Sequence, residues 1–132
     1  IPPNPDDGYG VFARRYNPKG IPHGSEFKVN SYTTNIQSLP AISMNGNGDF
    51  IISWLSNNQT DGGAKSIYAQ RYASTGSTNG SEFKVNVLTN NSNDRPAIAM
   101  DTLGDFIITW QYGTSPSFDI LSHRFNSGGT SL

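Results

Sequence analysis

A repeat of 56 residues constrains this chain more than any other feature of its sequence. Three segments of the first copy return in the second at this offset, namely 24–30 as 80–86, 40–44 as 96–100 and 48–54 as 104–110. Over the stretch from 24 to 54, 19 of 31 positions are identical in the two copies. Repeats of this length are typical of arrays in which each unit buries its apolar faces against its neighbours.

A further segment occurs three times, as 12–16, 68–72 and 121–125. The chain therefore holds one complete unit with partial units on both sides. We divide it into an N-terminal tail (1–10), a partial repeat with the third and fourth strands and a crossover (11–39), a complete repeat with its crossover (40–95), a partial repeat with the first to third strands (96–125) and a C-terminal tail (126–132).

The pattern within the unit predicts strands rather than helices. Each repeat is expected to form four short strands, which in the complete unit lie at 41–44, 49–55, 66–72 and 82–86. In 49–55 the side chains alternate, with Phe50, Ile52 and Trp54 on one face of the strand. The glycine-rich segment at 45–48 is typical of a tight hairpin turn.

The composition agrees with many short strands and turns. Charged residues make up 14% of the chain, against roughly a quarter in an average globular domain. Four antiparallel strands per repeat, apolar on both faces, indicate β-propeller-like blades, and a duplicated β-sandwich is the alternative fold. Propellers have about 4–8 blades, so we expect the chain either to be a fragment of a longer array or to assemble with copies of itself.

Charge and hydropathy exclude two classes of partner. The formal net charge is -1, and no segment is strongly basic, so nucleic acid is not expected. No apolar run approaches the roughly 20 residues of a membrane-spanning helix, so membrane insertion is not expected. The chain has no cysteine, which excludes disulfides and thiolate metal sites.

The titratable residues show no catalytic pattern. Most carboxylates occur as repeat-related pairs, such as Asp49 with Asp105, and symmetry spreads such residues instead of bringing them together. His23 and His123 occupy unrelated positions in the repeat, and neither belongs to a triad motif. We therefore expect the protein not to be an enzyme and to need no cofactor.

One segment has the spacing of a calcium loop. Asn45, Asn47 and Asp49 offer oxygen ligands at alternate positions. The second copy has Leu103 at the middle position, so the ligand set does not recur. The competing interpretation is a hairpin turn whose side chains bind backbone amides.

Four residues are candidates for ligand contact. Arg15, Arg71 and Arg124 recur at one position of the third strand, where they serve either the scaffold or an acidic group such as sulfate or an acidic sugar. Tyr112 lies beyond the strand pattern and has no counterpart in the other copy, so it is the aromatic best suited to contact a sugar.

The repeat resembles one found in very large surface and secreted proteins of bacteria, including cyanobacteria. That pattern runs as E-F-x-V-N, then T-x-x-x-Q-x-x-P-x-[IV]-A, G-x-F-[IV]-[IV]-x-W and Y-A-Q-R-[FY]. The matching segments here are 26–30, 33–42, 48–54 and 68–72, although the pattern's glutamine, Gln37, is Asn93 in the second copy. The resemblance implies a propeller-like, secreted or cell-surface protein, and it implies no activity.

Together these observations favour a non-enzymatic structural or adhesive module of an extracellular bacterial protein. It would act through weak multivalent contacts or self-association, with copies of itself or neighbouring repeats as partners. The alternative is a carbohydrate-binding, lectin-like propeller whose ligands are glycans.

Overall fold

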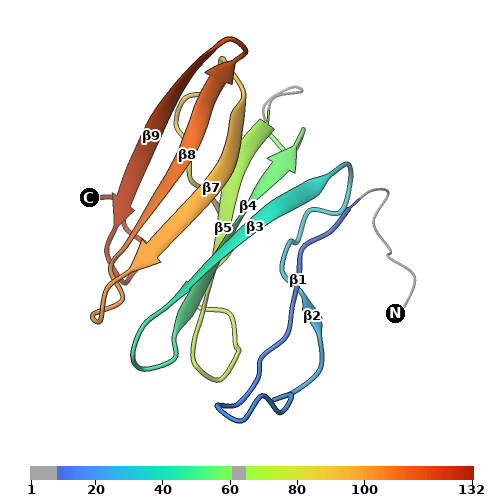
Figure 1. Ribbon diagram of the computed structural model, residues 1–132, viewed down its shortest axis with the longest axis vertical. Helices are drawn as coiled ribbons and strands as arrows, with labels where there is room; N and C mark the ends of the chain where they lie inside the picture. The colour runs from blue at the N-terminus through green and yellow to red at the C-terminus, as the bar shows by residue number, and fades with distance from the viewer. Residues whose placement is uncertain (1–8, 61–64) are drawn as a thin grey trace.

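The computed structural model describes residues 9–60 and 65–132, which form β-strands and no helix. The strands belong to three antiparallel sheets (Figure 1). The first sheet contains β1 (Phe12–Ala13) and β2 (Phe27–Lys28). The central sheet contains β3 (Gln37–Met44), β4 (Phe50–Asn57), β5 (Lys65–Tyr72) and β6 (Phe83–Lys84). The third sheet contains β7 (Asn93–Met100), β8 (Phe106–Thr114) and β9 (Ser117–Phe125).

The two copies of the repeat fold in the same way. Strands follow one another in chain order within each sheet. Met44 pairs with Phe50 in the central sheet, and Met100 pairs with Phe106 at the equivalent place in the third sheet. Equal sequence thus gives equal register, because the alternating apolar residues and the hairpin turn fix the pairing.

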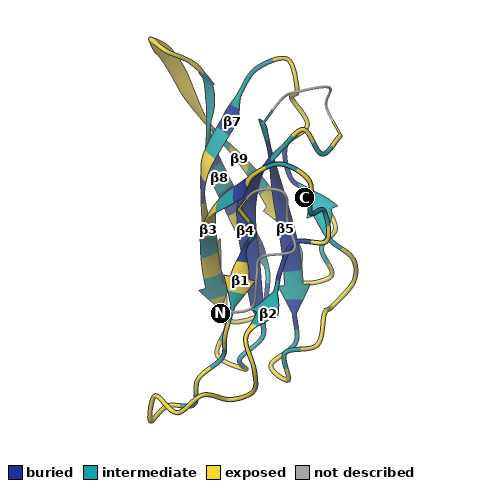
Figure 2. Ribbon diagram, turned by 90° about the vertical axis from the view of Figure 1, so that its right-hand side faces the viewer, coloured by how far each residue is buried: buried dark blue, intermediate teal, exposed yellow. Residues whose placement is uncertain are grey.

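The three sheets stack face to face in series, so the central sheet is covered on both sides (Figures 1 and 2). We call the side of a sheet that carries Phe50, Ile52 and Trp54, or their equivalents, its front face. The front face of the central sheet packs on Val11 and Val29, which flank the strands of the first sheet. All five side chains are buried, and the burial of each stabilises the fold by about 1.5–3 kcal/mol relative to leaving that side chain exposed.

The opposite side of each sheet is its back face, represented in β4 by Ile51 and Leu55. This back face packs on the front face of the third sheet, formed by Phe106, Ile108 and Trp110. The stacking is therefore directional: the back of one sheet meets the front of the next. The alternation predicted for 49–55 is confirmed, and Phe106 and Trp110 lie between sheets as expected.

Strands β3 and β7 begin earlier than the sequence predicts. The first strand of the unit was expected at 41–44, but β3 starts at Gln37, inside the expected crossover. Its register against β4 shifts around Leu39, whose φ of 53° marks a β-bulge. Arg95 has a φ of 52° at the same place in β7. A proline follows each bulged residue, which a sheet tolerates at a bulge because the ladder needs no N–H there.

The chain ends differ from the expected tails. Within 126–132, Asn126 N donates to Thr130 O at 2.9 Å, and Phe125 pairs with Ser131. The same turn follows β5 within the central sheet, where Tyr72 pairs with Thr78. Residues 126–132 are thus the turn of the repeat rather than a tail. Residues 1–8 of the expected N-terminal tail lie outside the described residues.

The prediction of an all-β chain of antiparallel strands is confirmed. The sheets have two, four and three strands, and no closed propeller forms within the described ranges. Over the same ranges no helix has the length and apolar character needed to cross a membrane.

Candidate interface between repeats

The recurring arginines connect each sheet to the next. Arg15, which follows β1, donates from Nη1 to the backbone oxygen of Ser74 in the central unit at 2.7 Å. Arg71 in β5 donates from Nη1 to the backbone oxygen of Ser127 in the third unit at 2.5 Å. Burial in this contact lowers the pKa of Arg71 from its ordinary value. Both bonds are charge-assisted, which makes them stronger than neutral ones.

The acceptor lies in a short turn that ends in glycine. These glycine turns are residues 17–20, 73–76 and 126–129. A Cβ atom on Gly76 would lie 2.6 Å from Nε of Arg15, and one on Gly129 would lie 2.9 Å from Nε of Arg71. Both glycines also have positive φ, at 90° and 83°. Glycine is therefore required twice over, for the backbone conformation and for the approach of the guanidinium.

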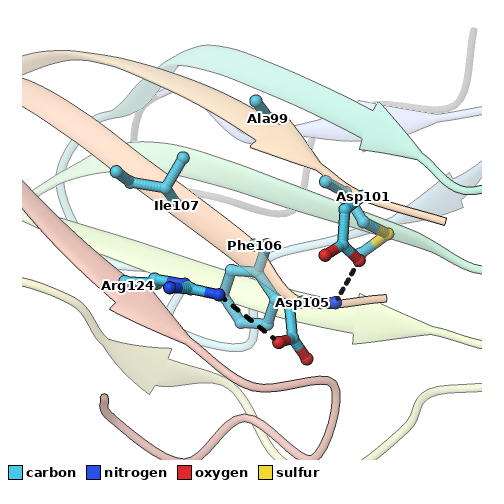
Figure 3. Close-up of a pocket in the computed structure, with 7 residues that line it drawn as sticks. Ala99, Asp101, Asp105, Phe106, Ile107 and Arg124 are labelled. Carbon is cyan, nitrogen blue, oxygen red and sulfur yellow. Dashed lines mark hydrogen bonds and ion pairs between the residues drawn. The ribbon is translucent and has the colours of Figure 1, made fainter. Parts of the chain in front are cut away.

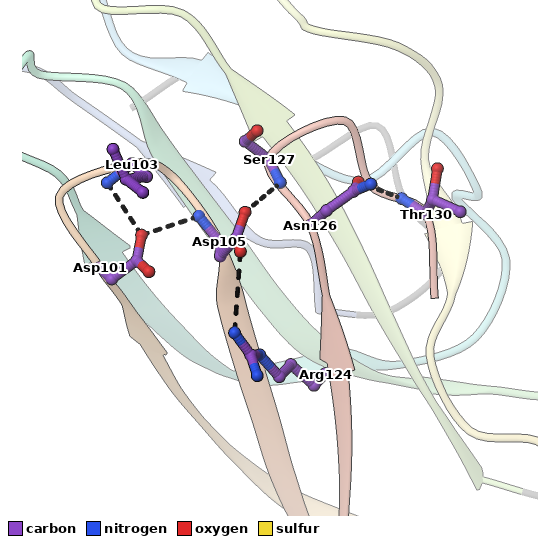
Figure 4. Close-up of polar contacts among 7 residues, drawn as sticks. All are labelled: Asp101, Leu103, Asp105, Arg124, Asn126, Ser127 and Thr130. Atoms are coloured by element: carbon purple, nitrogen blue, oxygen red, sulfur yellow. Dashed lines mark hydrogen bonds and ion pairs between the residues drawn. The ribbon is translucent and has the colours of Figure 1, made fainter. Parts of the chain in front are cut away.

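A recurring aspartate holds the glycine turns 73–76 and 126–129 in place. Asp49 Oδ1 accepts a hydrogen bond from Ser74 N at 2.9 Å, and Asp105 Oδ1 accepts one from Ser127 N at 2.9 Å (Figure 4). The same serine thus gives its N–H to an aspartate of its own sheet and its carbonyl to an arginine of the preceding sheet. The Gly-Asp-Phe motif consequently has a positional role at the junction between repeats.

Arg124 is the third recurring arginine, and it lies on the back face of the third sheet. Its Nη2 is 3.8 Å from Asp105 Oδ2, and its side chain is 62% exposed (Figure 4). Among the described residues no further sheet covers it. The three arginines predicted as candidate ligand contacts therefore lie on three successive sheets, Arg15 and Arg71 at the two junctions between them, and they form no common site.

Tyr112 lies far from the arginines along the sheet. Its OH donates to Asn90 Oδ1 at 2.5 Å, and its ring packs against the core between the central and third sheets. It pairs with Asp119, near the end of β8 opposite to the end where Arg124 pairs with Ile107. The structure does not bring Tyr112 and the arginines together.

Two residues of the predicted calcium loop, Asn45 and Asp49, bind backbone amides through their side-chain oxygens. Asn45 Oδ1 accepts from Asn47 N and from Asp49 N, both at 3.0 Å. Asp101 makes the same two bonds in the third sheet, to Leu103 N and Asp105 N. Within 9–60 and 65–132, no three His, Cys, Asp or Glu side chains gather closely enough to hold a metal ion. The geometry is that of a side-chain-braced hairpin turn.

Sequence reasoning missed the buried amides. Asn30 Oδ1 accepts from Val11 N at 2.7 Å, and Asn86 Oδ1 accepts from Ile67 N at 2.8 Å. Asn93 Oδ1 accepts from Trp110 Nε1 at 2.9 Å. The asparagine that ends the recurring segments 24–30 and 80–86 carried the signal, because a polar residue that recurs in both copies next to an apolar strand indicates a bound backbone group.

The carboxylate of Glu82 joins two loops. Its Oε2 accepts from Ser31 N at 2.8 Å and from Ser31 Oγ, and its Oε1 accepts from Gln59 Nε2 at 2.6 Å. Ser31 belongs to the crossover that leaves the first sheet, so this carboxylate also ties two units together.

No protein-family model matches the chain, and no curated protein matches it either.

Proposed function

We propose that the protein is a non-enzymatic structural or adhesive repeat module that works by joining repeats in series. One observation carries the proposal: the same arginine-to-carbonyl contact is made twice, by Arg15 to Ser74 and by Arg71 to Ser127. A contact that recurs with the repeat serves the array rather than one site. Many such weak contacts add up in an extended or multivalent protein.

The proposed arrangement of the full assembly is a propeller of blades. Its support is the serial stacking, in which a sheet with strands in chain order meets its neighbours through both faces. A two-layer sandwich buries one face of each sheet and exposes the other. The central sheet instead buries both Ile51 and Ile52, on opposite faces of β4, which favours blades.

The non-enzymatic part of the proposal is supported by what the carboxylates do. Asp49 and Asp105 each bind a glycine turn, and Glu82 binds two loops. These are scaffold contacts. The proposed location, secreted or at a bacterial cell surface, rests on the resemblance of the repeat to those of large bacterial surface proteins.

Insertion of one more repeat tests the proposal. A second copy of residues 40–95 placed between Arg95 and Pro96 keeps the register, because Leu39 precedes Pro40 in the same way. The longer chain should unfold at a higher urea midpoint, since each unit adds a covered face. The matched control carries Ile51→Lys and Arg71→Gln in the inserted copy only. An inserted repeat that leaves the midpoint unchanged contradicts the proposal.

A carbohydrate-binding function is the second candidate, and one crevice favours it. Between the first and central sheets lies a cavity of about 350 Å³ lined by Arg14, Tyr16, His23, Met44 and Phe50, among others. The corresponding crevice between the central and third sheets holds about 50 Å³, so the site does not recur with the repeat. A glycan array with and without calcium tests this candidate, and Tyr16→Ala should abolish any binding seen.

A further inference from the structure

The back face of the central sheet shows how a repeat receives its neighbour. Arg71 reaches the carbonyl of Ser127 in the glycine turn of the third unit. The adjoining hairpin residue Asn45 lies against Gly104, with its Nδ2 3.6 Å from the position of a Cβ there. Ile51 is covered in the same contact and is fully buried. We call these residues of the back face a seat, and in the central sheet the third unit occupies it.

The back face of the third sheet carries the same seat without an occupant among the described residues. Asp101, Asp105 and Arg124 stand at the positions of Asn45, Asp49 and Arg71. With Ile107 they line an open cavity of about 320 Å³ (Figure 3). Figure 3 shows the guanidinium of Arg124 beside the carboxylate of Asp105 in this lining.

The seat keeps exposed apolar side chains. Ile107 is 38% exposed and Ile120 is 75% exposed, whereas their counterparts Ile51 and Ile67 are fully buried. Two other counterparts are more polar, since Gln111 replaces Leu55 and Ser122 replaces Ala69. Contact with this face therefore buries less apolar surface than the internal junctions do, and we expect it to be weaker.

The opposite end of the molecule carries an unused glycine turn. Residues 17–20 are built like the other two turns, with Gly20 N donating to Asn17 O at 2.9 Å and Gly20 at a φ of 75°. At Gly76 and Gly129 an arginine fills the space beside the glycine. At Gly20 no atom of the described residues lies within 4 Å of the Cβ position. Tyr16, next to this turn, is also exposed.

Charge makes these two ends complementary. The seat has Asp101 where the internal seat has the neutral Asn45. The unused turn has Lys19 where the internal turns have Thr75 and Gly128. Opposite charges thus stand at the two ends, and the internal junctions lack this pair. Such a pair favours one partner and one orientation.

We infer that a second copy of this chain docks on the back face of the third sheet, with its 17–20 turn seated against Arg124. Arg124 then donates to the carbonyl of Pro18, as Arg71 does to that of Ser127. The inference rests on the proposed function and specifies the surface through which the module self-associates. The contact is heterologous, so repeated docking gives an open chain or a ring of copies.

Sedimentation velocity of the whole chain over a wide concentration range tests the docking. The wild-type protein should associate reversibly, and added salt should weaken the association. Arg124→Gln should weaken it at least about tenfold. Arg95→Gln removes an exposed arginine elsewhere on the third sheet and should leave the association unchanged. Urea midpoints check that each variant remains folded.

Mixing of two variants tests the head-to-tail geometry. Ile120→Glu blocks the seat and Tyr16→Glu blocks the turn side, and both residues are exposed in the single chain. Each variant alone should stay monomeric, whereas the mixture should form a dimer that grows no further. A symmetric contact through one surface would not be rescued in this way.

Three results would overturn the docking. They are a wild-type chain that stays monomeric at every concentration, association that Arg124→Gln leaves intact, and a mixture that stays monomeric. None of them decides the proposed function, which depends on the inserted repeat. If the inserted repeat stabilises the chain while the wild type stays monomeric, the repeats join in series only within one chain.

Discussion

The central and third sheets are built from related copies of the repeat in different surroundings. Ile51 and Ile107 are equivalent, yet the first is fully buried and the second is 38% exposed. Arg71 binds a carbonyl of the next unit, whereas Arg124 lies beside Asp105 of its own sheet. The repeat therefore fixes the shape of a sheet, while the presence of a neighbour decides what its back face contributes to stability.

The largest expected effect separates these two isoleucines. Ile51→Ala should lower the free energy of unfolding by about 2–5 kcal/mol, because it leaves a cavity between two packed sheets. Ile107→Ala removes the same atoms from a face open to solvent and should cost less than about 1 kcal/mol. Urea denaturation of the two variants measures the difference. Equal losses would show that the third sheet is as well covered as the central one.

A smaller effect is expected for the two arginines. Arg71→Gln removes the hydrogen bond to Ser127 O and should destabilise the monomer by about 1 kcal/mol. Arg124→Gln removes only an exposed ion pair and should leave monomer stability nearly unchanged. Thermal unfolding of both variants at low protein concentration provides the comparison. An equal loss of stability in both variants would mean that the ion pair of Arg124 with Asp105 contributes as much as the inter-sheet hydrogen bond of Arg71.

The smallest expected effect is a loss of stability that occurs only in alkaline solution. Burial, and to a lesser extent the charge of Glu82, raises the pKa of Tyr72 to about 12. The folded state thus binds the phenolic proton more tightly than the unfolded state, whose pKa is about 10. This contribution to stability is complete below about pH 10 and is lost as the pH rises toward 12. Phe125 occupies the equivalent position in the third sheet and carries no such proton.

The melting temperature of the wild type should therefore fall more steeply above pH 10 than that of Tyr72→Phe. Both proteins should behave alike at neutral pH, apart from a constant offset. Tyr16→Phe, at the exposed equivalent position in the first sheet, is the matched control and should follow the wild type. Parallel melting curves for the wild type and Tyr72→Phe would show that this hydroxyl is not protected by burial.

Much of the sheet structure could be predicted because its signals are local. The alternation through Phe50, Ile51 and Ile52 defined both faces of β4, and the glycine at 48 marked its hairpin. The start of β3 could not be predicted, because the bulge at Leu39 interrupts the alternation of side chains. The residues before the bulge pair with the far end of β4, which the local sequence does not reveal. Alternation is lost where one residue is added to a strand.

The candidate interface was only half visible in the sequence. Recurrence singled out Arg15, Arg71 and Arg124, but their acceptors could not be predicted, because Ser74 lies 59 positions from Arg15 and belongs to another sheet. The oxygens of Asn45 and Asp49 had the spacing of a metal loop, and only the tertiary structure shows that they accept hydrogen bonds from backbone amides.

The sequence by itself determined the unit: its length, its antiparallel strands and the alternation that makes both faces apolar, since these depend on neighbouring residues in the chain. Only the tertiary structure decided how the units meet. Stacking is directional because the back face of one sheet fits the glycine turn of the next, and that fit joins an arginine side chain to a backbone carbonyl more than fifty residues away. The same stacking leaves Arg124 at one end and the 17–20 turn at the other.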